Sequence, residues 1–157
     1  MKIIYLKINS IFKVIYLNMG GQQSIIQKCN FEDIQNIVSK KNCILINTLS
    51  TKQQDCLIKG TIESNIEEKV INDILKNSDD IQIFIYGKNN NDNSIYEKYK
   101  QLNELGIKNI YVYCGGLFEW LCLQDIYGED EFPTTIKELD VLKFKPISAF
   151  NQLYLTN

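Results

Sequence analysis

Short apolar runs alternate with amphipathic stretches along most of the chain. Residues 43–47, 81–86 and 110–113 are almost entirely apolar, which is typical of strands that are buried on both faces of a parallel sheet. Residues 64–75 and 94–105 instead repeat apolar side chains at helical spacing, and both open on S-x-x-E, the spacing of a helix-capping box. Strands that alternate with helices predict an α/β domain, because parallel strands need crossover connections.

The flanking elements are shorter. Residues 24–29 predict a first strand and residues 30–39 a helix, whereas residues 48–59 predict only a helical turn. A third capping-box spacing, T-x-x-E, predicts a last helical turn over residues 135–142. The whole pattern predicts one α/β domain with a parallel sheet of about five strands and helices on both faces.

The same pattern divides the chain into three parts. Residues 1–23 form an N-terminal extension, residues 24–142 form the α/β domain, and residues 143–157 lack a clear period and form a C-terminal tail. The uncharged runs of the extension are too short to span a bilayer.

The extension contains a candidate acylation motif. The stretch from Met19 to Ser24 reads M-G-x-x-x-S, so Gly20 would be N-myristoylated if translation began at Met19. The alternative is that translation begins at Met1 and that this stretch is a polar turn. A single acyl chain would give only weak, reversible membrane association.

The composition removes several kinds of chemistry. All 17 basic side chains are lysines, and with neither arginine nor histidine the chain lacks the usual bidentate anion clamp and the commonest general base. The formal net charge of −2 and the absence of a basic stripe argue against nucleic-acid binding. Five cysteines without a C-x-x-C pair indicate reduced thiols in a cytoplasmic protein rather than a structural zinc site, and no cofactor or metal is predicted.

The loop that follows residues 81–86 is the candidate site, because ligands of open parallel sheets bind at the carboxyl ends of strands. A helix is predicted to begin directly after this loop, and its N-terminus would add backbone N–H donors there. The predicted binding loop consists of Gly87, Lys88, Asn89, Asn90, Asn91, Asp92, Asn93 and Ser94.

Several segments resemble the rhodanese-like family. Residues 105–120 read L-G-I-K-N-I-Y-V-Y-C-G-G-L-F-E-W, and the family pattern there is L-G-[FY]-x-N-V-x-x-L-x-G-G-[FY]-x-x-W. Residues 44–48 (I-L-I-N-T) and 58–62 (I-K-G-T-I) stand where the family has L-I-D-V-R and H-I-P-G-A. The match covers about residues 24–127, and residues 117–135 also resemble a divergent rhodanese subgroup of protists and large DNA viruses. The resemblance implies a rhodanese-like three-layer α/β/α fold.

The resemblance also implies where a nucleophile would lie. In active rhodanese-like proteins a cysteine opens the loop, and backbone N–H groups at a helix N-terminus stabilise its thiolate and its persulfide. Gly87 takes that position here, and the loop contains no cysteine. The family's aspartate and arginine after the second strand are replaced by Asn47 and Leu49. These departures predict a catalytically inactive rhodanese-like domain that serves as a protein-binding or small-anion-binding regulatory module.

Cys114 is the alternative nucleophile. It precedes Gly115 and Gly116 at the end of a predicted strand, where donors of the following helix could stabilise a thiolate. The alternative function is a sulfurtransferase or thiol-redox enzyme that uses Cys114, whereas a buried, unreactive thiol is the simpler interpretation. We expect an unidentified protein partner and a cytoplasmic location, peripheral to a membrane if Gly20 is acylated.

Overall fold

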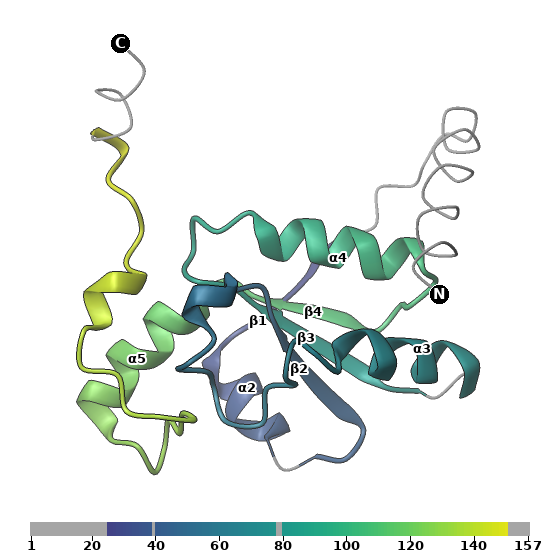
Figure 1. Cartoon of the computed structure of the whole chain (residues 1–157), viewed down its shortest axis with the longest axis horizontal. Coiled ribbons are helices and arrows are strands. Elements are labelled where there is room, and N and C mark those ends of the chain that lie inside the picture. The colour runs from purple at the N-terminus through teal and green to yellow at the C-terminus, as the bar shows by residue number, and fades with distance from the viewer. Residues whose placement is uncertain (1–24, 39, 78–79, 151–157) are drawn as a thin grey trace.

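Four parallel strands form the centre of the computed structural model, which describes residues 25–38, 40–77 and 80–150 (Figure 1). The strands lie in the order β1–β4–β3–β2, and Phe84 of β3 pairs with Leu45 of β2 and with Tyr111 of β4. Every connection therefore crosses over, as the alternation of strands and helices predicts. The bounds are β1 (Gln27–Cys29), β2 (Cys43–Asn47), β3 (Gln82–Tyr86) and β4 (Ile110–Tyr113).

A fifth position adjoins β2 at the edge of the sheet. Thr61 forms an isolated parallel bridge with Leu45, and the Ile62 N–H donates to the Leu45 carbonyl at 2.9 Å. The predicted parallel α/β sheet is therefore confirmed, with four strands and this bridge in place of about five strands.

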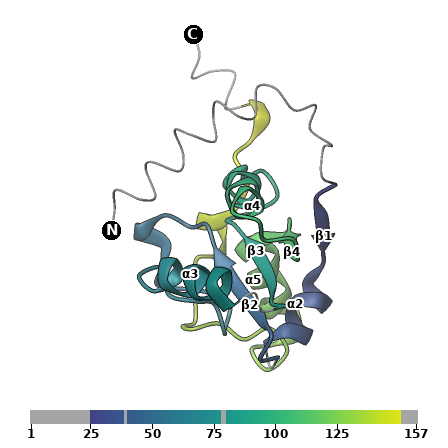
Figure 2. The ribbon, with the colours of Figure 1, turned by 90° about the vertical axis from the view of Figure 1, so that its right-hand side faces the viewer.

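Helices cover both faces of the sheet (Figure 1 and Figure 2). Two of them, α2 (Phe31–Ile37) and α5 (Gly116–Tyr127), share one core with Phe84 and Tyr86 of β3. The other two, α3 (Glu67–Asn77) and α4 (Ser94–Glu104), share a second core with Ile83 and Ile85. Successive side chains of a strand point to opposite faces, so the apolar run of β3 supplies both cores. The three layers are those of an α/β/α fold.

Two helix starts differ from those that the capping spacings predict. α3 begins at Glu67, after a turn that starts at Ser64. The N-cap of α4 is Asn93, which has no side-chain cap, and the hydroxyl of Ser94 instead contacts the carboxylate of Asp92 in the loop. The prediction of a capping box that starts at Ser94 was therefore wrong, because this serine is the first residue inside the helix.

The last predicted helical turn is also wrong, because residues 135–142 are described and contain no α-helix. The Thr135 N–H donates to the Leu57 carbonyl at 2.8 Å, and the Thr135 hydroxyl accepts from the Leu57 N–H at 3.0 Å. Both groups of Thr135 are used in this pairing and cannot cap a helix. The structure also describes two 3-10 helices, η2 (Thr51–Gln53) and η3 (Val141–Phe144).

Residues 129–150, called the C-terminal arm below, pack against α5 and continue the core. Phe132 and Phe144 are 3 % and 0 % exposed and belong to the core that α5 helps to form. The Trp120 ring meets Phe132 edge-on with 5.0 Å between ring centroids. The core therefore extends into the segment whose sequence shows no clear period.

The N-terminal extension, including Met19 and Gly20, lies outside the described residues. Acylation of Gly20 and the start of translation stay predictions. Within the described part of the chain, no helix is both long enough and apolar enough to cross a membrane.

Three weakly acidic side chains with little access to water make the fold less stable at alkaline pH. Burial raises the pKa of the Tyr86 and Tyr113 hydroxyls above the ordinary phenol value. Burial, together with the Asp33 carboxylate and Cys114, raises the pKa of the Cys29 thiol to about 12. Above about pH 9 the unfolded chain loses these protons while the folded chain keeps them, so the free energy of unfolding falls as pH rises. Below that pH their contribution to stability is fully present.

Urea unfolding at a series of alkaline pH values measures this loss, and the ultraviolet absorbance of phenolate reports when the tyrosines ionise. We expect Tyr86 and Tyr113 to ionise only as the chain unfolds, and Tyr86→Phe to flatten the dependence of stability on pH. Tyr127→Phe is the control, because this side chain is 64 % exposed. Equal flattening by both variants would contradict the assignment.

Candidate functional site

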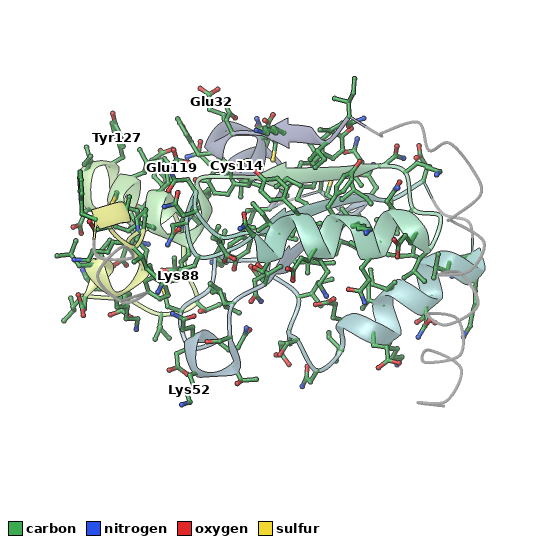
Figure 3. All side chains as sticks on the ribbon, turned by 90° about the horizontal axis from the view of Figure 1, so that it is seen from above. Glu32, Lys52, Lys88, Cys114, Glu119 and Tyr127 are labelled. Atoms are coloured by element: carbon green, nitrogen blue, oxygen red, sulfur yellow. The ribbon has the colours of Figure 1, made fainter. Side chains whose placement is uncertain are left out.

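A pocket of about 340 Å³ lies at the carboxyl edge of the sheet, where the loops after β2 and β3 meet the C-terminal arm. Five of the eight predicted loop residues line it, whereas Gly87, Asn90 and Asn93 do not. Figure 3 shows Lys88 on this loop, apart from Cys114 at the end of β4. The pocket is lined by Thr48, Leu49, Ser50, Gln53, Lys88, Asn89, Asn91, Asp92, Ser94, Lys145 and Ile147.

The carboxylate of Asp92 fills the inside of the predicted loop. Its Oδ2 accepts from the Lys88 N–H at 2.7 Å, and its Oδ1 accepts from the Ser94 N–H at 3.0 Å. The Ser94 Oγ lies 2.6 Å from the same Oδ1. A carboxylate of the chain itself therefore binds one backbone donor of the loop, at Lys88, and one at the N-terminus of α4, at Ser94. A helix N-terminus is the kind of site where external anions bind.

Gly87 is buried directly beside this carboxylate. A Cβ atom added at Gly87 would lie 2.5 Å from Asp92 Oδ2 and 2.8 Å from the Cγ2 atom of Ile95. Both distances are far below ordinary van der Waals contact. The position at which the family resemblance expects a cysteine therefore has no room for any side chain while Asp92 occupies the loop.

The N-terminus of α5 is also satisfied internally. Its Leu117 and Phe118 N–H groups donate to the carbonyls of Gly87 and Lys88 at 2.9 and 3.0 Å. This approach requires a glycine at Gly116, because an added Cβ would lie 2.6 Å from the Gly87 carbonyl oxygen and the φ angle is +65°. The second glycine of the G-G pair thus brings the loop against α5, and these two donors are not available to a ligand.

Asn89 connects the loop to the C-terminal arm. Its side chain is 6 % exposed, its Nδ2 donates to the Phe144 carbonyl at 2.7 Å, and its Oδ1 accepts from the Asn91 N–H at 3.0 Å. Asn89, a residue of the predicted binding loop, lines the pocket, and its amide also holds the arm that supplies Lys145 and Ile147 to the same lining.

The pocket residues that lie outside the loop after β3 were not among the predicted site residues. For Thr48, Leu49 and Ser50 a sequence signal existed, because they follow a buried strand whose carboxyl end shares an edge with β3. For Lys145 and Ile147 there was none, since the arm has no periodic pattern.

Asn47 lies where the resemblance expects an aspartate. It is 6 % exposed, and its Oδ1 accepts from the Leu49 N–H at 3.0 Å and from Gln54 Nε2 at 2.8 Å. The side chain therefore shapes the loop after β2 and does not line the pocket.

Cys114 is half-buried at the end of β4, and its Sγ lies 3.6 Å from the Tyr96 hydroxyl. It packs against the core of α3 and α4 and does not line the pocket. Burial also raises the pKa of the Cys56 and Cys122 thiols. No cysteine of the described ranges reaches the pocket, and no group of three or more acidic or thiol side chains in these ranges could hold a metal ion.

No protein-family model matches the sequence, and a search of curated proteins finds no match. The fold is similar to the crystal structure of the BH2092 protein from Bacillus halodurans, with a TM-score of 0.51 and 17 % identity over 65 % of this chain and 74 % of that one. It also aligns to a variant of EanB in complex with ergothioneine covalently linked with a persulfide cysteine, with a TM-score of 0.47 and 16 % identity over 85 % of this chain and 33 % of EanB. The likeness to BH2092 shows the fold alone.

Proposed function

We propose that this chain is a rhodanese-like domain without sulfurtransferase activity, and that it binds a partner through the pocket at the carboxyl edge of its sheet. The carboxylate of Asp92 carries the proposal. It accepts hydrogen bonds from the Lys88 and Ser94 N–H groups and leaves no room for a side chain at Gly87. A thiolate or persulfide needs such donors, and here they are already used.

Rhodanese chemistry also needs a thiol within reach of the bound substrate. Among the described residues, the pocket is lined by hydroxyl, amide, lysine and aliphatic groups and by one carboxylate, without a cysteine. No histidine exists in the chain to activate a distant nucleophile. These features support binding rather than catalysis.

The alternative assigns catalysis to Cys114. The contact between its Sγ and the Tyr96 hydroxyl, at 3.6 Å, favours this alternative, since a phenol could donate a hydrogen bond to a thiolate. Cys114 would then act in a site separate from the pocket.

A transfer assay distinguishes the two functions. The full chain is incubated with thiosulfate and cyanide, and thiocyanate is measured for the parent, Cys114→Ala and Cys56→Ala. We expect all three to give only the uncatalysed rate. Thiocyanate production by the parent that is lost in Cys114→Ala and kept in Cys56→Ala would overturn the proposal and establish the alternative.

A further inference from the structure

Two lysines line the pocket from opposite walls. Lys88 belongs to the loop after β3, and Lys145 belongs to the C-terminal arm. Among the residues that the structure describes, neither forms an ion pair, whereas Lys98, Lys137 and Lys143 each have a carboxylate partner. Two lysines of one pocket lining therefore have no ion-pair partner among the described residues.

The carboxylate that lies nearby forms no ion pair with either lysine. Asp92 lines the same pocket, but its two oxygens accept from the Lys88 N–H, the Ser94 N–H and the Ser94 hydroxyl. Neither oxygen is within ion-pair distance of a described lysine ammonium. The other polar side chains of the lining are neutral hydroxyls and amides. The hydroxyls of Thr48, Ser50 and Ser94 already donate within the protein, whereas the amide of Asn91 can donate to an anion.

We infer that the pocket binds a carboxylate side chain of an acidic segment in a partner protein; this rests on the proposed binding function. Lys88 and Lys145 would donate to the carboxylate, and the side-chain amide of Asn91 in the same lining would add a donor. Charge-assisted hydrogen bonds of this kind are about twice as strong as neutral ones.

The aliphatic part of the lining favours a peptide over a free small acid. Leu49 is buried in the floor of the pocket, whereas Ile147 lines the pocket and is still 62 % exposed. A ligand that ends inside the pocket leaves the outer part of Ile147 in water. A peptide whose backbone continues out of the pocket on both sides of the bound carboxylate would cover the exposed part of Ile147 and gain an apolar contact there.

Three probes test this inference with the full chain: an acetylated and amidated hexaglutamate peptide, the matching hexaglutamine peptide, and glutarate at the same carboxylate concentration. Amide shifts in NMR spectra report the site of binding, and calorimetry reports the affinity. We expect hexaglutamate to bind and to move the amide signals of Thr48, Ser50 and Asn91. Hexaglutamine should not bind, and glutarate should bind at least about tenfold more weakly than hexaglutamate.

Paired variants separate the pocket from general attraction between charges. Lys88→Gln/Lys145→Gln should weaken hexaglutamate binding at least about tenfold. Lys52→Gln/Lys108→Gln removes the same charge from exposed lysines outside the pocket lining and should change the affinity less than about twofold. Thermal unfolding checks that both double variants are folded.

Several results would overturn the inference. They are no binding of hexaglutamate, equal binding of hexaglutamine, or an equal loss of affinity in both double variants. Equal affinity for glutarate would show that the pocket binds a free small acid and not an acidic segment of a partner protein. None of these results changes the outcome of the thiocyanate assay, which tests the proposed function separately.

Discussion

Replacing Phe144 by alanine is expected to lower the free energy of unfolding by about 3–5 kcal/mol. The ring is 0 % exposed and belongs to the core that contains Trp120 and Phe132. Alanine would leave a cavity there, because packed cores relax only partly around a missing ring. Urea unfolding of the full chain measures the loss. The loss matters for the site because the ring anchors the part of the arm whose backbone carbonyl, at Phe144, accepts a hydrogen bond from Asn89 of the loop.

Phe150 provides the matched control on the same arm. Its ring is 76 % exposed, so Phe150→Ala should change the free energy of unfolding by no more than about 0.5 kcal/mol. If Phe144→Ala lowered the free energy of unfolding as little as Phe150→Ala, the arm would not be part of the core. Lys145 and Ile147 would then not be held at the pocket.

Replacing Asp92 by alanine is expected to lower the free energy of unfolding by about 2–4 kcal/mol. The change removes the acceptor of two backbone N–H groups, from Lys88 and Ser94, and of the Ser94 hydroxyl. Each lost hydrogen bond involves a charged acceptor, but the site is only half-buried, and water can replace part of the interaction. Asp92→Asn should lose less, since its amide oxygen still accepts.

A second measurement tests whether the loop is filled by its own carboxylate. With Asp92 removed, the freed N–H groups of Lys88 in the loop and of Ser94 at the N-terminus of α4 should bind an external anion. Sulfate should therefore raise the melting temperature of Asp92→Ala more than that of the parent. Asp73→Ala is the control for charge, because Asp73 is exposed and its ion pair with Lys76, at 3.9 Å, contributes little. An equal response of the parent to sulfate would show that the donors were free from the start.

The central part of the fold could be predicted from the sequence because its apolar pattern is local. The runs that became β2, β3 and β4 are apolar on both faces, and a parallel sheet covered by helices is the arrangement that buries such runs. The position of the candidate pocket could also be predicted, because the loop after β3 lies at the carboxyl edge of the parallel sheet, where ligands of such sheets bind.

Two other features depend on contacts between residues far apart in the sequence. Thr135 has the spacing of a capping box, but pairing with Leu57 uses its backbone N–H and its hydroxyl. Phe144 has no periodic neighbours, yet it packs in the core because the arm returns to α5. The position of the Asp92 carboxylate could not be predicted either, because it depends on the folded path of the loop and not on the type of residue.

The position of Asp92 also sets the order in which substitutions could introduce sulfur chemistry on this scaffold. Gly87→Cys alone would place its Cβ 2.5 Å from the Asp92 carboxylate, so the loop would have to change shape before it held a thiol. A small residue at position 92 would have to come first, at a cost in stability, and the Ile95 side chain, 2.8 Å from the same Cβ, would also have to move. A Gly87→Cys chain as stable as the parent would disprove this order. The first substitution on this route, a small residue in place of Asp92, would destabilise the fold without adding a thiol.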